Sequence, residues 1–255
     1  RWRMIINKEK RIGQVLFIVE GSSTEFNYLY KIFCGLLGYS YVAKKRNTPD
    51  YYVKDSDPYS KVAVVNTRES NIRDISENPK YLDDVFDVLR EQYHFPVERS
   101  AIYYLFDRDP ESNTNIELIE KYIKILANPY DNEDGEQAGQ LLLSYPSIES
   151  FIVSNFIDET INLYFGLGKE VKNYIGKNKQ IQLNKISDKT LIKAAYEFMS
   201  YLTAEEITWD IDDFAPASFA VFTKQEANYL LGGGFRLFSM LTLALFQMGI
   251  LELDK

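Results

Sequence analysis

The chain has 255 residues, of which 45% are apolar and 26% charged, and its formal net charge is −8 at pH 7. These values are typical of a soluble globular protein. They exclude one that holds nucleic acid by overall charge alone, so local basic patches or metal ions would have to meet a polyanion. With a single histidine and a single cysteine, the chain also lacks the ligands for a structural zinc site.

The compartment is predicted from the cysteine content and the apolar tracts. Cys34 has no cysteine partner for an internal disulfide, and the N-terminal residues show no signal peptide. The most apolar tract, residues 235–251, contains Arg236 and is too short for a confident membrane span. We therefore expect a cytoplasmic protein without membrane association.

The first predicted elements are a strand and a helix. QVLFIVE, residues 14–20, is an apolar run with β-branched residues, which predicts a strand buried on both faces. The next residues place apolar side chains at helical spacing, with Ser22 or Ser23 as the N-cap and Gly38 as the stop.

The alternation of strand and helix continues as far as residue 146. It predicts a parallel sheet with flanking helices and right-handed crossovers, and thus an α/β domain over residues 1–146. The predicted strands are 61–67, 100–109 and 140–146, the helices are 81–95 and 114–127, and the loops are 44–60 and 128–139.

After residue 146 the pattern becomes helical. Residues 147–157, 188–203 and 224–250 all have helical character, and no strand is predicted there. Within the last segment, LLGGGF at 231–235 is predicted as a loop or hinge, and residues 235–251 as a buried helix. We therefore expect a mainly helical C-terminal portion over residues 147–255.

Three carboxylates stand where two predicted strands end. Glu20 follows the first strand, and Asp107 and Asp109 end the strand 100–109. Functional groups gather at the carboxyl ends of parallel strands, so the three would converge if the two strands are neighbours. A hard cation such as Mg²⁺ would relieve their repulsion. The alternatives are that Glu20 faces solvent, that Asp107 caps the next turn, and that Asp109 is a turn residue before Pro110.

These residues carry a resemblance to a known domain family. IVEGSSTE at 18–25 and LFDRD at 105–109 resemble the TOPRIM domain, which topoisomerases, bacterial primases and OLD-family nucleases share. The resemblance covers about residues 12–146 and implies a Rossmann-like parallel sheet. It implies that Glu20 is the catalytic glutamate, a metal ligand and general base, and that Asp107 and Asp109 bind Mg²⁺ or Mn²⁺.

The segment SYPSIESFI at 144–152 narrows the resemblance. It is similar to the stand-alone TOPRIM effectors of bacterial anti-phage defence, the RloB-like proteins and the nuclease subunit of the PARIS system. The likeness implies that Glu25 is a second-site metal ligand and that Arg108 and Glu149 support the site. The alternatives are that Glu25 stabilises the N-terminus of its helix by its charge and that Glu149 caps the helix on which it lies. No residue is placed as the distal lysine of OLD-type nucleases.

The resemblance implies an Mg²⁺-dependent nuclease that cleaves RNA, specifically tRNA, as a toxic effector of phage defence. GLGKE at 166–170 lacks the P-loop spacing, so we expect no ATP site in this chain. The resemblance instead implies a separate ABC-type ATPase partner. The alternatives are an inactive TOPRIM-like module of an ATPase or DNA-repair assembly, a DNA-cleaving OLD-type nuclease, and a primase or topoisomerase fragment.

Two surface predictions complete the sequence analysis. Basic clusters contribute the candidate nucleic-acid contacts Lys44, Lys45, Arg46, Lys177 and Lys179, although a solvated face is the usual role of such clusters. The tract 235–251 is apolar on nearly every side, so we expect a homodimer or the ATPase partner to cover it, unless it forms the centre of the helical portion.

Overall fold

The computed structural model describes residues 3–42, 49–67, 70–77, 79–130 and 139–254. The chain forms two compact units, each assembled from segments that are distant in sequence. The first unit comprises Arg1–Lys10, Phe106–Lys124 and Leu142–Lys255, and the second comprises Arg11–Leu105 and Ile125–Leu141. The domain boundary predicted at residue 147 stays a prediction.

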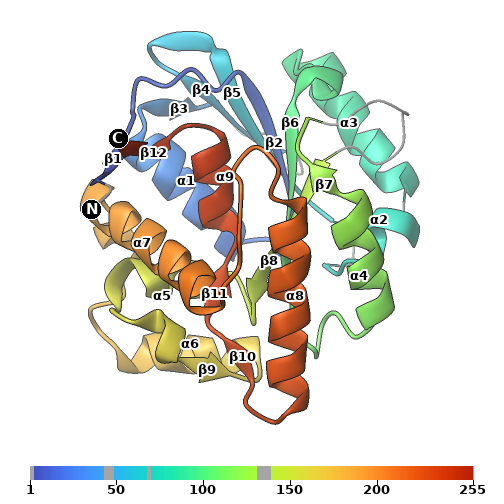
Figure 1. Ribbon diagram of the computed structural model, residues 1–255. Helices are drawn as coiled ribbons and strands as arrows, with labels where there is room; N and C mark the ends of the chain where they lie inside the picture. Colours follow the sequence, from blue (N-terminus) through green and yellow to red (C-terminus); the bar gives the residue numbers. More distant parts are fainter. Residues whose placement is uncertain (1–2, 43–48, 68–69, 78, 131–138, 255) are drawn as a thin grey trace. The chain divides into compact units, whose positions relative to one another are not determined.

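The second unit is built on a mixed sheet with the strand order β6-β2-β5-β4-β3 (Figure 1). Its central strand, β2, pairs in parallel with β5 and with β6, whereas β4 is antiparallel to both β5 and β3. The α/β class is confirmed, but the prediction of a purely parallel sheet is wrong. The strands are β2 (Gln14–Val19), β3 (Tyr39–Tyr41), β4 (Asp50–Lys54), β5 (Asp57–Asn66) and β6 (Ala101–Asp107), the last of which continues into the first unit.

The antiparallel part of the sheet occupies residues that were predicted as a loop. β4 lies inside the segment 44–60, and β5 starts at Asp57 rather than at Lys61. Two polar residues, Asp55 and Ser56, separate the strands, and the buried rings of Tyr51 and Tyr52 anchor β4. Aromatic side chains favour strands, and here they outweigh the charged residues and the proline around them.

Helices α1 (Thr24–Leu36) and α3 (Pro79–Tyr93) of the second unit confirm two predicted helices, whereas the short helix α2 (Asp74–Glu77) was not predicted. Helix α1 buries Leu29, Ile32 and Phe33, and the Phe33 ring lies 6.1 Å from that of Phe17 on β2. The remaining elements are the 3₁₀ turn η1 (Val97–Arg99) and the short strand β7 (Ala127–Asn128), which pairs with the start of β8 (Gly139–Tyr145).

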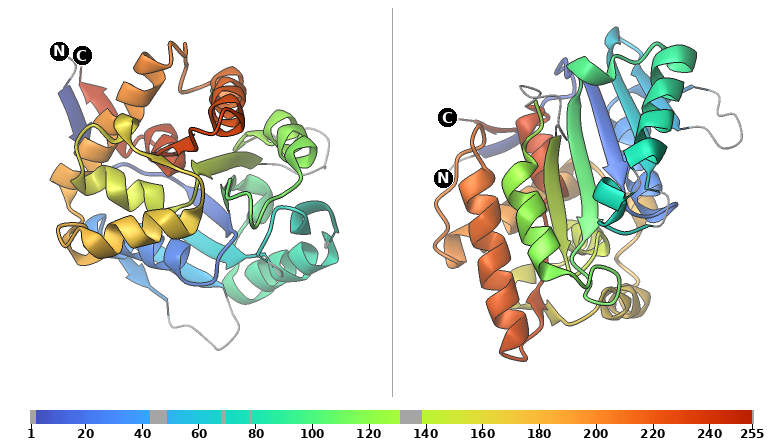
Figure 2. Two further views of the ribbon diagram at one scale, coloured as in Figure 1. Left: turned by 90° about the horizontal axis from the view of Figure 1, so that it is seen from below. Right: turned by 90° about the vertical axis from the view of Figure 1, so that its right-hand side faces the viewer.

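The first unit is largely helical. Its ends lie side by side as β1 (Arg3–Ile6) and β12 (Leu251–Asp254), which pair antiparallel, and α5 packs against α7 (Figure 2). The elements between them are α4 (Ile116–Ile125), α5 (Glu149–Phe156), η2 (Thr160–Asn162), β9 (Tyr164–Phe165), α6 (Gly168–Lys177), η3 (Leu183–Lys185), α7 (Asp188–Ala204), α8 (Ala215–Leu230), β10 (Phe235–Arg236), β11 (Phe238–Ser239) and α9 (Leu241–Gln247).

Two predictions for this region are wrong. Short strands occur after residue 147, with β10 paired to β9 and β11 paired to the end of β8. The tract 235–251 is not one helix, because it folds as β10, β11 and α9 and then enters β12. Its large apolar side chains are nevertheless buried within the chain itself, as Phe238 shows by its ring contacts with Phe198 and Tyr201 on α7. The tract therefore gives no reason to expect a second copy.

Among the helices of the described segments, none is both long enough and apolar enough to cross a bilayer.

Candidate functional site

Glu20 stands at the carboxyl end of the central strand of the second unit. The neighbouring strands required by the sequence argument are present, since β2 and β6 pair in parallel from Val15 and Ala101 to Val19 and Leu105. The backbone N–H of Glu20 donates to the Leu105 carbonyl at 3.0 Å, so the pairing extends through Glu20 itself. The Glu20 side chain is buried. A buried carboxylate at this position differs from the solvent-facing alternative.

Glu25 is held beside Glu20 by a close contact in the first turn of α1. Its carboxylate oxygen Oε1 accepts a hydrogen bond from the backbone N–H of Gly21 at 2.9 Å. A Cβ at Gly21 would lie 2.4 Å from Oε2, so the absence of a side chain there makes room for the carboxylate. The Glu-Gly pair that the sequence singled out thus places a second buried acid next to the end of β2.

Asp107 and Asp109 belong to the first unit, where both orient backbone groups. Asp107 is the last residue of β6, and its Oδ1 accepts a hydrogen bond from the N–H of Ile148 at 2.8 Å. Asp109 lies beyond the strand and accepts hydrogen bonds from the N–H of Glu111 at 3.0 Å and of Gly168 at 2.8 Å. The capping and turn roles are therefore present, and a carboxylate oxygen that accepts one hydrogen bond can also bind a cation.

Two buried oxygen atoms beside these aspartates make no hydrogen bond within the described residues. They are Oγ of Ser147 and Oε2 of Glu149, the first residue of α5. A Cβ at Gly168 would lie 2.7 Å from Oδ2 of Asp109 and 3.3 Å from Oγ of Ser147, so these two atoms border the same small space. Buried polar groups are normally paired. The unpaired Oγ of Ser147 and Oε2 of Glu149 are therefore candidates for contact with a ligand.

Lysines on α6 border the acidic cluster. This cluster comprises Asp107, Asp109, Ser147 and Glu149. Nζ of Lys172 lies 3.5 Å from Oε1 of Glu149, and Nζ of Lys169 lies 2.9 Å from Oε1 of Glu111. Both lysine side chains are largely exposed and could turn toward a phosphate. Lys172 lies on the same helix as the predicted contact Lys177, but no local pattern predicts its pairing with Glu149.

Arg108 does not face the cluster. Its Nε and Nη2 both donate to the carboxylate of Glu226 on α8, and Nη1 donates to the carbonyl of Asn113 at 3.1 Å. The side chain is buried, with its guanidinium carbon 5.3 Å from the centroid of the Phe235 ring. The Arg108 guanidinium is therefore engaged by Glu226 and by the Asn113 carbonyl. Asn113 in turn donates to the Asp107 carbonyl at 2.6 Å, which connects Arg108 to the turn that contains the two aspartates, and its support of the site stays a prediction.

The donor set agrees with the chemistry of Mg²⁺ or Mn²⁺, which are hard cations that prefer oxygen ligands. Carboxylates at Asp107, Asp109 and Glu149 and the hydroxyl of Ser147 would supply only oxygen. Within the described residues, no three acidic, histidine or cysteine side chains are grouped as a ready-made metal site. Mg²⁺ commonly uses one or two carboxylates together with substrate phosphates and waters, so two aspartates meet its minimum. The participation of Glu20, in the other unit, stays a prediction.

The predicted basic contacts are only partly described. Lys177 and Lys179 are exposed at the C-terminal end of α6, whereas Gly168 at the other end of this helix meets Asp109. Lys44, Lys45 and Arg46 lie outside the described residues.

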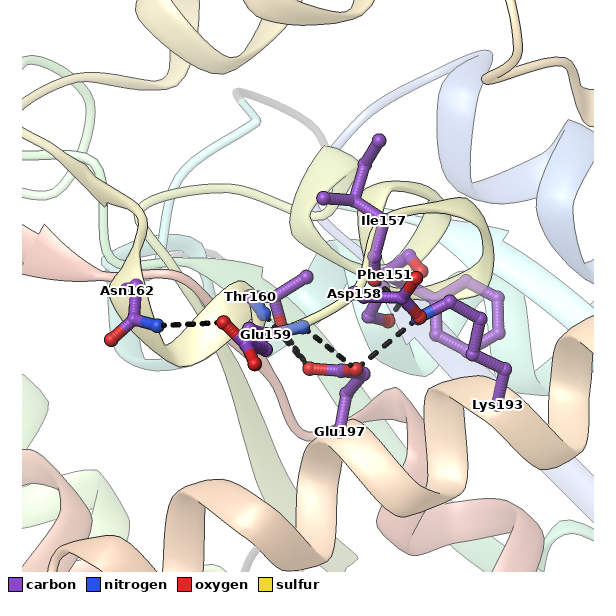
Figure 3. A network of polar contacts seen from close by, with 9 residues as sticks. Phe151, Ile157, Asp158, Glu159, Thr160, Asn162, Lys193 and Glu197 are labelled. Carbon is purple, nitrogen blue, oxygen red and sulfur yellow. Dashed lines mark hydrogen bonds and ion pairs between the residues drawn. The ribbon is translucent and has the colours of Figure 1, made fainter.

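A second polar cluster in the first unit is internally satisfied (Figure 3). Glu197 on α7 accepts hydrogen bonds from the backbone N–H of Glu159 and from the N–H and hydroxyl of Thr160, the last two at 2.8 Å. Lys193 binds Glu197 at 3.2 Å, Asp158 at 2.9 Å and the carbonyl of Ile157. Because these contacts pair the groups with one another, the cluster fixes η2 to α7 and offers no reactive group among its described residues.

No protein-family model matches the chain, and neither the curated proteins nor the solved structures contain a significant match to it.

Proposed function

We propose that the protein is a metal-dependent phosphodiesterase that cleaves nucleic acid, built on a TOPRIM-like variant of its α/β fold. The observation that supports this most is the parallel pairing of β2 with β6. This pairing makes Glu20 and Asp107 the acidic residues at the carboxyl ends of adjacent strands, the edge at which α/β proteins bind ligands.

The acidic residues would hold Mg²⁺ or Mn²⁺, with Asp107 and Asp109 as the metal-binding pair and Glu20 as a further ligand. A bound metal would polarise the phosphodiester and offset the charge that develops during cleavage. Glu20 would also accept the proton of the attacking group as general base. Glu25 would be a ligand for a second metal, and Ser147 and Glu149 would orient the phosphate or a metal-bound water.

The lysines of α6 would contribute the positive charge that the acidic chain otherwise lacks. Lys169 and Lys172 are paired with carboxylates that border the cluster, so an incoming phosphate could exchange with those carboxylates. Lys177 and Lys179 would extend the contact along the helix, as phosphate contacts that position a strand without reading its sequence.

The resemblance in sequence supports RNA, and tRNA in particular, as the substrate of a toxic antiviral effector with a separate ABC-type ATPase partner. DNA cleavage and a non-catalytic regulatory role are the competing proposals. A regulatory module has no use for acids at the ends of adjacent strands, one of them buried, which is why we place catalysis first.

A substrate panel separates these proposals. The purified chain is incubated with tRNA, single-stranded RNA and duplex DNA, each with Mg²⁺, Mn²⁺ or EDTA, and the products are resolved on denaturing gels. We expect metal-dependent cleavage of tRNA and none in EDTA. Cleavage of DNA alone would favour the OLD-type alternative. Intact substrates in all metal conditions, including incubation with a co-expressed ATPase partner, would favour the regulatory module.

A further inference from the structure

A hollow on the first unit lies immediately beyond the acidic cluster. Its volume is about 610 Å³, and it is formed where β9, the start of α6 and the loop after α8 meet. Pockets for small organic ligands span about 300–1,000 Å³, so the hollow has the size of a binding site. Gly166 belongs to its lining, and two residues later Gly168 donates its N–H to Asp109.

The wall of the hollow is aromatic, and it is stacked onto the interior. Tyr229 lines the hollow and stacks on Phe235 with ring centroids 4.6 Å apart and planes within 9° of parallel. The guanidinium carbon of Arg108 in turn lies 5.3 Å from the Phe235 centroid. Tyr164, which also lines the hollow, is 43% exposed, and Arg236 lies over its ring at 5.1 Å. A planar ligand could extend this set of stacked groups toward the surface.

The charge of the lining selects against a phosphate. Glu170 lines the hollow, with Oε2 held by the N–H groups of Gly166 at 2.6 Å and Leu167 at 3.1 Å. Among the described residues that line the hollow, none is cationic. A carboxylate of fixed orientation can accept a hydrogen bond from an exocyclic amino group, as acidic side chains do with cytosine N4.

The floor of the hollow is made of glycines, which keep it open. At Gly232 a Cβ would have no atom within 4 Å, and at Gly233 it would meet only the carbonyl of Asn228 at 3.4 Å. A side chain at either position would therefore project into free space. Gly233 has no positive φ, so a side chain there, even a large one, is compatible with the backbone.

We propose that this hollow binds an unstacked nucleobase of the substrate strand, adjacent to the phosphate held at the acidic cluster. The inference rests on the proposed nuclease function and adds to it a base-specific contact. Stacking on the tyrosines would provide the affinity, since every base has a flat face that aromatic side chains accept. Glu170 would favour bases that present an amino group. Recognition of an unpaired base also agrees with a loop of a folded RNA rather than an uninterrupted duplex.

The test measures binding without cleavage. Fluorescence anisotropy in EDTA compares a labelled single-stranded RNA ten-mer with an abasic oligonucleotide of the same length. The variants are Gly233→Trp, which projects a large ring into the hollow, and Tyr164→Leu, which removes an aromatic surface. Leu231→Ala is the matched control, because Leu231 is adjacent and 87% exposed but is not among the lining residues.

We expect Gly233→Trp and Tyr164→Leu to weaken binding of the RNA about 5- to 100-fold, the range that stacking of one base provides. The control should bind like the wild type, and the abasic oligonucleotide should bind all four proteins equally. Equal RNA affinities across the folded variants, an equal loss for the abasic probe, or no RNA binding by the wild type would overturn the proposal. Because no metal is present, a protein that binds but never cleaves would contradict the nuclease function alone.

Discussion

The buried ion pair between Arg108 and Glu226 provides a prediction whose size follows from its surroundings. The two side chains are 2% and 10% exposed, and the Arg108 guanidinium makes two hydrogen bonds to the Glu226 carboxylate. In Glu226→Ala the cation would keep only its bond to the Asn113 carbonyl. Removal of one partner of a buried pair costs about 3–5 kcal/mol, because the remaining charge is left without compensation.

Equilibrium urea unfolding measures this loss. With a slope of about 3 kcal/mol per molar urea, Glu226→Ala should lower the midpoint by about 1–1.7 M. The exposed pair of Glu120 and Lys124 on α4 is the matched control, and Glu120→Ala should cost no more than about 0.5 kcal/mol. The double variant Arg108→Met with Glu226→Leu should recover most of the loss. Equal costs for Glu226→Ala and Glu120→Ala would refute the reasoning.

Three further predictions follow from single contacts. Gly168→Ala would place a Cβ 2.7 Å from Oδ2 of Asp109, so the rate of cleavage should fall at least about tenfold. The control is Gly176→Ala on the same helix, where a Cβ meets no atom within 4 Å and the rate should not change. Equal rates for the two variants would contradict this reasoning. Burial, and after it two nearby carboxylates, raises the pKa of Cys34 from 9.0 to about 12, so iodoacetamide at pH 8.5 should label the folded chain far more slowly than the urea-unfolded chain. The same shift makes stability decline as the pH rises above 9, because the unfolded thiol then loses its proton first. Glu197→Gln should lower the free energy of unfolding by about 1–3 kcal/mol in urea titrations, and a change below about 0.5 kcal/mol would show that the network in Figure 3 is not stabilising.

The parallel centre of the sheet could be predicted because its signal is local. The apolar runs that became β2, β6 and β8 are flanked by polar or helix-forming residues, and their side chains are buried throughout. β4 could not be predicted in this way, because its buried members include Asp50 and Lys54, which in sequence look like loop residues. Only the tertiary structure provides each of these two charged side chains with its polar partners.

The tract 235–251 shows the difference between burial and secondary structure. Its composition correctly predicts that nearly all of its apolar side chains are buried. The chain path depends on Gly234, whose φ of +75° and close approach to the Phe165 backbone turn the chain into β10 instead of continuing a helix. Composition alone contains no information about that contact.

Part of the candidate site could be predicted because its sequence signal is local. The spacing of Asp107 and Asp109 after a strand is local, and so is the position of Glu20. The direction of Arg108 depends on Glu226, 118 residues later, and the position of Asp109 depends on a backbone N–H of α6. Such long-range partners are fixed by packing, so no local pattern predicts them.

The most direct measurement is the initial rate of tRNA cleavage in Mg²⁺ by Glu20→Gln and Asp107→Asn, compared with the wild type. Asp84→Asn, on the exposed side of α3, is the control for removal of a negative charge. Loss of a metal ligand costs several kcal/mol in the transition state, so both site variants should be at least about 100-fold slower while their thermal unfolding is unchanged. The control should cleave like the wild type, and EDTA should stop every reaction. Wild-type rates in a folded Glu20→Gln variant would contradict the metal-dependent mechanism.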